Sequence, residues 1–116
     1  MSYKCVDLDG VKVYFFNNLV HRLDGPAKEW HYGLKEWYCN GIRHRLDGPA
    51  VIWGDGTKEW HLNGKRHRVD GPDIEYENGE KEWWYDGKHY QSEEDWFKDL
   101  PREDQVAYLF NMRIIK

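Results

Sequence analysis

The 116-residue sequence lacks most features of a secreted, membrane-spanning or metal-binding protein. Cysteine occurs only at Cys5 and Cys39, which is too few for a disulfide framework and has no metal-site spacing. No run approaches the roughly 18 apolar residues of a membrane helix. The N-terminus is polar within its first ten residues, so we expect no signal peptide. These absences predict a soluble protein of a reducing cytoplasm, with no membrane partner.

Catalytic chemistry is equally sparse. Beyond residue 2, the only hydroxyl side chains of the serine and threonine type are Thr57 and Ser92, in turn and helix-cap contexts. No nucleophile elbow, phosphate loop or zinc spacing occurs. His31, His61 and His89 belong to different repeat units and have no ligand at metal-binding spacing. We therefore expect no enzymatic activity, no cofactor and no metal.

The chain is rich in aromatic rings and in charge. Aromatic residues make up 16% of the sequence and charged residues 33%, with seven tryptophans and eleven glycines. Because few aliphatic residues accompany them, any core has to be built from rings, which suits strands better than helices. The net charge of −4 argues against binding to duplex nucleic acid, which favours a basic face.

An internal repeat determines the expected architecture. The heptapeptide HRLDGPA begins at His21 and again at His44, and HRVDGP begins at His67, so the interval is 23 residues. Complete units and a partial fourth begin at Lys12, Lys35, Lys58 and Lys81. Because one hairpin cannot bury its own rings, neighbouring units have to cover one another.

Each unit contains two turn signals. The early signals are Asn40-Gly41, Asn63-Gly64 and Asp86-Gly87. The late signals are Asp9-Gly10, Asp55-Gly56 and Asn78-Gly79. Both residues of such dipeptides tolerate positive φ, which favours tight hairpins. We therefore predict a mainly β fold: an antiparallel hairpin meander in a single twisted sheet over residues 1–90, with no helix longer than about two turns between Lys12 and Lys81.

The tail has a different character. Ser92 followed by Glu93, Glu94 and Asp95 resembles a capping box, which predicts a helix start. Pro101 should end this helix and open a second one, from Arg102 to about residue 112, with helical apolar spacing. Residues 91–116 are thus expected to form a two-helix cap over the last repeat, since an open sheet end invites self-association.

Strand alternation assigns two buried ring ladders and one exposed face. The first ladder is Tyr14, Trp37, Trp60 and Trp83, and the second is Trp30, Trp53 and Tyr76. The opposite face carries Phe15, Tyr38, His61 and Trp84 at one repeat position, beside Glu36, Glu59 and Glu82. Tyrosine and tryptophan are common interface anchors, so Tyr38, His61 and Trp84 are candidate binding residues. The alternative, that the tail helices cover this face, stays open.

The stretch KEWHLNGKRHRVDGPDIEYENGEKEWWYDGK resembles the MORN repeat family, whose unit is also about 23 residues long. The shared frame is an aromatic strand, Asn/Asp-Gly, Lys-Arg-His, a glycine-containing loop, and a second aromatic strand. The chain differs from that pattern in its His-Arg-x-Asp-Gly-Pro loop, which is similar to repeat proteins encoded by tailed bacteriophages. Over roughly residues 3 to 90, the resemblance implies a hairpin meander and a binding role, but no particular partner.

The His-Arg-x-Asp-Gly-Pro loop allows two interpretations. In the first, the histidines and arginines form a stripe that binds an anionic ligand or an acidic partner, because the arginine fork suits carboxylate and phosphate. These residues are His21, His44, His67, Arg22, Arg45 and Arg68. In the second, favoured because every unit repeats the set, each arginine pairs with a loop aspartate and only shapes the turn. The structural residues are then Asp24, Asp47, Asp70, Gly25, Gly48, Gly71, Pro26, Pro49 and Pro72.

Together these features predict a binding module that associates with another protein. The resemblance implies a phage protein in the cytoplasm of an infected bacterium that modulates or inhibits a host protein, for example in a defence system. One alternative is a protein that sequesters an anionic nucleotide signal through the His-Arg stripe and ring stacking. Another is a structural or assembly protein, and self-association into a homo-oligomer also stays open.

Overall fold

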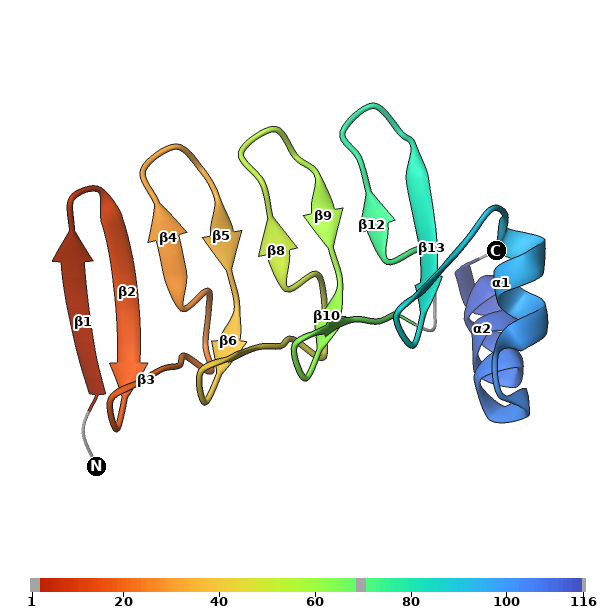
Figure 1. The fold of residues 1–116 in the computed structure, drawn as a ribbon, viewed down its shortest axis with the longest axis horizontal. Coiled ribbons are helices and arrows are strands. Elements are labelled where there is room, and N and C mark those ends of the chain that lie inside the picture. Colours follow the sequence, from red (N-terminus) through yellow and green to blue (C-terminus); the bar gives the residue numbers. More distant parts are fainter. Residues whose placement is uncertain (1–2, 69–70, 116) are drawn as a thin grey trace.

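The computed structural model describes residues 3–68 and 71–115, with side chains up to residue 110. It forms a row of antiparallel hairpins in chain order, with two helices at the C-terminal end (Figure 1). We call the hairpins whose tips point upward in Figure 1 upper hairpins, and those at the bottom lower hairpins. The described residues contain no helix before α1, as the repeat predicted.

The upper hairpins form the main sheet. Its strand order is β1-β2-β4-β5-β8-β9-β12-β13-β14, with β3 pairing with β2. The upper strands are β1 (Tyr3–Leu8), β2 (Val11–Phe16), β4 (Lys28–Trp30), β5 (Lys35–Glu36), β8 (Val51–Ile52), β9 (Lys58–Glu59), β12 (Ile74–Glu75) and β13 (Lys81–Tyr85). All the paired strands are antiparallel, which is the meander expected from the sequence.

The lower hairpins follow the bottom edge of this sheet in Figure 1. Their additional strands are β3 (Leu19–Val20), β6 (Tyr38–Cys39), β7 (Ile42–Arg43), β10 (His61–Leu62), β11 (Lys65–Arg66) and β14 (Lys88–Tyr90). The β6–β7 and β10–β11 pairs form two-stranded sheets of their own. The strand regularity breaks at Trp37 and Trp60, whose backbone N–H groups instead donate to the carbonyls of Ala50 and Asp73.

The two turn types differ in geometry. Early turns such as Asn40-Gly41 place both residues at positive φ, 50° and 81°, as expected for a two-residue hairpin turn. In the late turns of the later repeats, such as Asp55-Gly56, only the glycine has positive φ, at 99°, because the loop has three residues. Asp9-Gly10 is a two-residue turn, and this shifts the β1–β2 register by one residue relative to the later upper hairpins.

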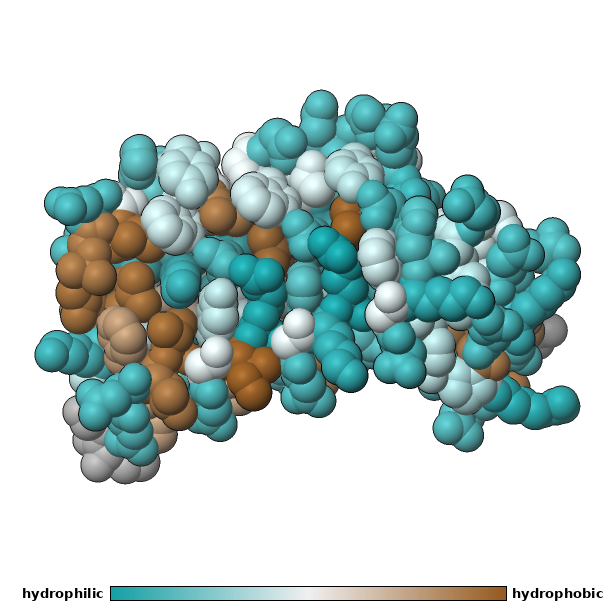
Figure 2. All heavy atoms as spheres, viewed as in Figure 1, coloured by the Kyte–Doolittle hydropathy of each residue, from teal (hydrophilic) through white to brown (hydrophobic). Residues whose placement is uncertain are grey.

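The sheet has two faces with different side chains. The arginine face carries Tyr14, Trp37 and Trp60 together with the loop arginines that lie over these rings. The glutamate face carries Glu36, Glu59 and Glu82, which accept hydrogen bonds from Trp30, Trp53 and Tyr76. Figure 2 shows apolar side chains gathered at the N-terminal end and mostly polar ones across the middle repeats.

The small side chains that follow each loop proline are the most buried part of the repeats. Ala27 and Ala50 are fully buried, and Val51 and Ile74 next to this position are also buried. Trp53 and Tyr76 were expected to share this burial, and that expectation is wrong, because both rings are exposed. They lie where the strand enters the three-residue loop, so the next hairpin covers the valine and isoleucine and leaves the rings open.

The C-terminal helices pack on the last repeat. Helix α1 spans Glu93–Asp99 and α2 spans Arg102–Ile115. Ser92 caps α1 by accepting a hydrogen bond from the Asp95 N–H at 3.1 Å, as its sequence predicted. Trp96 is fully buried, packs against the Trp83 ring with the ring centres 4.8 Å apart, and donates from its ring nitrogen to the carbonyl of Trp84. The helices therefore close the C-terminal end of the row, as Figure 1 shows.

Candidate functional site

Each loop arginine lies over an aromatic ring of its own repeat. The guanidinium carbon is 4.0 Å from the ring centre of Tyr14 for Arg22, and 4.1 Å from that of Trp37 for Arg45. Arg68 lies 3.8 Å from the centre of the Trp60 ring. Stacking of this kind combines cation–π attraction with the exclusion of water from the ring face. The ring ladder of the arginine face is thus half-buried beneath arginines.

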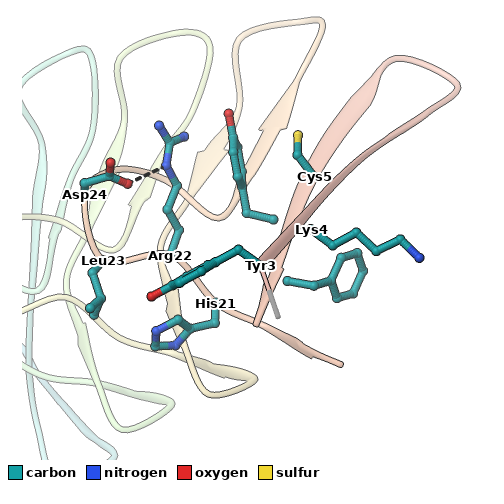
Figure 3. A pocket seen from close by; sticks show the side chains of 9 residues that line it. Tyr3, Lys4, Cys5, His21, Arg22, Leu23 and Asp24 are labelled. Atoms are coloured by element: carbon teal, nitrogen blue, oxygen red, sulfur yellow. Dashed lines mark hydrogen bonds and ion pairs between the residues drawn. The ribbon is translucent and has the colours of Figure 1, made fainter. Parts of the chain in front are cut away.

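The same guanidinium closes the loop. In the first two repeats, Nε donates to the loop carboxylate, over 2.9 Å from Arg22 to Asp24 and 3.0 Å from Arg45 to Asp47. This is the pairing that the structural interpretation of the loop expects, and Figure 3 shows it in the first repeat. The hydrogen bond from Arg22 lowers the pKa of Asp24, and that from Arg45 does the same for Asp47. Asp70, the equivalent residue in the third repeat, lies outside the described residues.

The loop glycine and the loop proline both contact this arginine. Nη1 donates to the proline carbonyl, over 3.0 Å from Arg45 to Pro49, and Arg22 and Arg68 reach Pro26 and Pro72 over 3.2 Å. A Cβ atom on Gly48 would lie 2.9 Å from the Arg45 guanidinium carbon, which is closer than side-chain packing allows. The corresponding distance is 2.7 Å from Gly71 to Arg68 and 3.0 Å from Gly25 to Arg22. A side chain at any of these positions would therefore push the arginine out of its place in the loop.

The loop histidines connect neighbouring repeats. His21 is buried, and its Nδ1 accepts a hydrogen bond from the backbone N–H of Asn40, 19 residues later, at 2.9 Å. His44 accepts from the Asn63 N–H in the same way, at 2.9 Å. Nδ1 is therefore unprotonated in this arrangement. His67 instead packs against the ring of Tyr85 at 5.7 Å. His21 and His44 thus hold the next repeat's early turn, a contact between repeats that sequence reasoning did not identify.

On the glutamate face, one carboxylate in each repeat gathers several donors. Glu36 accepts from the ring nitrogen of Trp30 at 2.8 Å and from Arg43 at 2.6 Å. Burial alone would raise the pKa of Glu36, but these hydrogen bonds lower it. Glu59 binds Trp53 and His61, and His61 is the main cause of the lowered pKa of Glu59.

The candidate binding residues Tyr38, His61 and Trp84 are engaged in this network. The Tyr38 hydroxyl, His61 Nε2 and Trp84 Nε1 each form a hydrogen bond with the carboxylate of the glutamate two residues earlier. The expectation that this repeat position presents exposed rings is wrong at His61, of which only 5% is exposed. Tyr38 and Trp84 are half-buried. The tail helices do not cause this burial at Tyr38 or His61, because both residues lie in the middle of the row (Figure 1).

The most exposed apolar side chains lie at the loop tips of the arginine face. Leu23 is 76% exposed and Leu46 is 82% exposed, at the same position in consecutive repeats. Between them runs a groove that is also lined by Arg22, Trp37 and His44. A smaller groove at the first repeat includes Leu23 and Tyr3 (Figure 3). Sequence reasoning overlooked these leucines, although their constant place between arginine and aspartate was visible.

Comparison with known proteins finds no matching family model, curated protein or solved structure. Within residues 3–68 and 71–115, no helix has the length and apolar character needed to cross a membrane. The same part of the chain contains no cluster of three or more side chains that could hold a metal ion. The site therefore has to be interpreted from its own geometry.

Proposed function

We propose that this chain is a non-enzymatic repeat module that binds another protein through its arginine face. The observation that carries the proposal is the pair of loop-tip leucines, Leu23 and Leu46, which expose most of their apolar surface at the same position of consecutive repeats. Single exposed leucines are unremarkable, but a repeated pair bordering a groove is typical of a protein contact. Groove residues Trp37 and Arg22 are of the types that dominate binding energy at interfaces.

The wider setting rests on the resemblance alone. A MORN-like repeat protein of the phage type would act in the cytoplasm of an infected bacterium, where it would modulate or inhibit a host protein, for example one of a defence system. Binding would require no chemistry, and the ionisable loop side chains already have structural partners.

The decisive experiment is capture of a partner from bacterial lysate, followed by mass spectrometry, with wild type and a Leu23→Asp/Leu46→Asp double variant. A partner retained in stoichiometric amount by wild type and lost by the double variant is the expected result. Val106→Asp is the matched control, because Val106 is an exposed apolar residue on α2, away from the loops. Equal capture by all three proteins would remove the arginine face from the interface.

A second candidate function is sequestration of an anionic nucleotide. The groove between the first two loops favours it, because a stacked arginine–tryptophan pair borders open space there. Base stacking on such a platform contributes about 1–3 kcal/mol per base. Calorimetry against cyclic and linear nucleotides separates the two functions. Binding in the micromolar range, lost in Arg45→Ala but kept in Leu23→Asp/Leu46→Asp, would favour the nucleotide.

A further inference from the structure

Across the arginine face, one row of cross-strand neighbours alternates in charge. Each residue in the row is the direct antiparallel partner of the next. In order, the row reads Asp7, Lys12, Glu29, Lys35, Ile52, Lys58, Glu75 and Lys81. Opposite charges facing one another across strands stabilise a sheet, and like charges destabilise it. The alternation holds at every position except Ile52, where an acid is missing.

The missing acid leaves two lysines without their shared neighbour. Lys35 and Lys58 flank Ile52 on either side, and both are exposed. Each lysine retains one glutamate on its other side, Glu29 beside Lys35 and Glu75 beside Lys58. Within the described part of the chain those two glutamates form ion pairs with the loop arginines, and no lysine of the row forms one. Lys35 and Lys58 lie about 10 Å apart, since two strand spacings of about 4.8 Å separate them. A carboxylate at position 52, such as Glu29 or Glu75 provides elsewhere, would lie between them.

The loop arginine above this position is also short of an acceptor. Arg22 donates from Nη1 to Glu29 at 2.9 Å, and Arg68 donates from Nη1 to Glu75 at 2.6 Å. The equivalent nitrogen of Arg45 donates to the Pro49 carbonyl and, among the described residues, to no carboxylate, because the Ile52 side chain has no acceptor. The carboxylate partner that Arg45 does have in the described residues, Asp47, binds Nε and is almost fully exposed. Three cations therefore surround one apolar side chain in the second repeat.

We propose that the second repeat binds one carboxylate group of a protein partner, over Ile52, between Lys35 and Lys58 and against Arg45. The glutamates of the flanking repeats show which chemistry fits, since each places a carboxylate on the equivalent arginine nitrogen. A carboxylate from outside completes the same arrangement, and charge-assisted bonds to arginine are among the stronger polar contacts. The inference rests on the proposed function in one respect: the carboxylate belongs to a protein.

The test uses a hexaglutamate peptide as the probe, with hexaglutamine as the uncharged control, in calorimetry and in NMR of the Arg45 Nε–H signal. We expect hexaglutamate, but not hexaglutamine, to shift that signal. Ile52→Glu should supply the missing acid from within and weaken peptide binding by roughly tenfold or more. Ile52→Gln, which has a similar shape without charge, should retain binding. An unshifted Arg45 signal, or wild-type affinity in Ile52→Glu, would overturn the proposal.

A gain-of-site variant makes the test sharper. Glu29→Ile opens the same gap between Lys12 and Lys35, beneath Arg22, so hexaglutamate should bind at two positions instead of one. A stoichiometry that stays at one would contradict the importance of the missing acid. Inorganic phosphate at the same concentration should displace the peptide only weakly. Free glutamate serves as the reference competitor. If phosphate displaced the peptide as strongly as glutamate does, the site would bind anions in general, and the assignment to carboxylate would be overturned.

Partner capture separates this inference from the proposed function. A protein captured equally by wild type and Ile52→Glu, but lost by Leu23→Asp/Leu46→Asp, would support the proposed function and overturn the carboxylate site. If hexaglutamate binds at Arg45 but Leu23→Asp/Leu46→Asp still captures every protein that wild type captures, the carboxylate site is supported and the proposed function is overturned.

Discussion

The second and third repeats have the same backbone and turn positions, yet they differ at the most buried position of the unit. Ala50 follows the loop proline in the second repeat, and Asp73 takes its place in the third. Both make the same backbone bonds: the tryptophan 13 residues earlier donates to each carbonyl, and each N–H donates to the glutamate nine residues later. At this position the two repeats thus differ in one side chain within the same backbone hydrogen bonds, so the pair isolates the effect of a buried acid.

Asp73 is energetically unfavourable at that position. None of its surface is exposed, and among the described residues neither carboxyl oxygen has a hydrogen-bond partner of regular geometry. The nearby backbone of Trp84 and Arg68 favours the charged form, but less than burial opposes it. Burial raises the pKa of Asp73 to about 8, despite the opposing influence of Arg68. Near neutral pH the folded protein therefore holds Asp73 mostly as the uncharged acid, whereas the unfolded chain ionises it.

The largest expected effect is that Asp73→Ala makes the third repeat like the second and stabilises the protein. Because the folded pKa lies above the unfolded value of 3.8, the wild-type acid is best tolerated below about pH 4. The stability of the wild-type protein then falls as the pH rises towards 8. The variant removes this loss, so we expect a gain of about 2–4 kcal/mol at pH 8. Urea unfolding of both proteins at pH 4, 6 and 8 measures it.

The reverse change tests whether the position or the repeat is responsible. Ala50→Asp places the acid in the second repeat and should destabilise it with the same dependence on pH. Asp73→Asn, which cannot ionise but retains the polar group, should remove the pH dependence without the full gain. An Asp73→Ala gain that is constant from pH 4 to 8 would show that Asp73 does not titrate between these values.

The second prediction concerns the stacked tryptophans, which the two repeats share. Trp37 and Trp60 are half-buried, each beneath its arginine, instead of fully buried as strand alternation predicted. Trp60→Ala and Trp37→Ala should each cost about 2 kcal/mol, less than the 3–5 kcal/mol of a fully buried ring. Thermal unfolding monitored by circular dichroism measures both. Losses that differ by more than about 1 kcal/mol would show that the two tryptophans contribute unequally to the stability of the fold.

The third prediction compares the loop arginines. Arg45→Ala removes the ring contact and the bonds to Asp47 and Pro49, and should cost about 1–2 kcal/mol. Arg22→Ala should cost more, because it also leaves Glu29 without its partner. Equal melting temperatures for wild type and Arg45→Ala, together with lost ligand binding, would instead assign the arginines to an anion-binding stripe.

The sequence predicted the parts of this structure that depend on local chemistry. Asn40-Gly41 was predictable as a turn because asparagine and glycine tolerate positive φ. Ser92 was predictable as the start of a helix because its hydroxyl can cap one. The pairing of Arg45 with Asp47 was also within reach, since two residues separate them in a tight loop.

The unpredicted parts depend on loop length and on contacts between repeats. Trp53 was assigned to a buried ladder because alternation ignores where a three-residue loop lifts the chain away from its neighbour. The bond from Asn40 to His21 spans two repeats, so no pattern within one unit reveals it. The gap at Ile52 required the strand register, because cross-strand neighbours are far apart in sequence.

The smallest expected effect lies in the late turns, where the two repeats use an acid and its amide. The Asp55 carboxylate accepts the Thr57 N–H at 2.8 Å, and the Asn78 side chain accepts the Glu80 N–H at 2.9 Å. The Thr57 N–H lowers the pKa of Asp55, so its contribution is present above the unfolded pKa and is lost as the pH falls through the folded one. Asn78 does not titrate. Asp55→Asn should therefore melt relatively later than wild type below about pH 4, and Asn78→Asp relatively earlier, in thermal scans from pH 5 to 2.5. Other acids titrate alike in all three proteins, so parallel melting curves across that range would mean that the Asp55 charge contributes nothing to its turn.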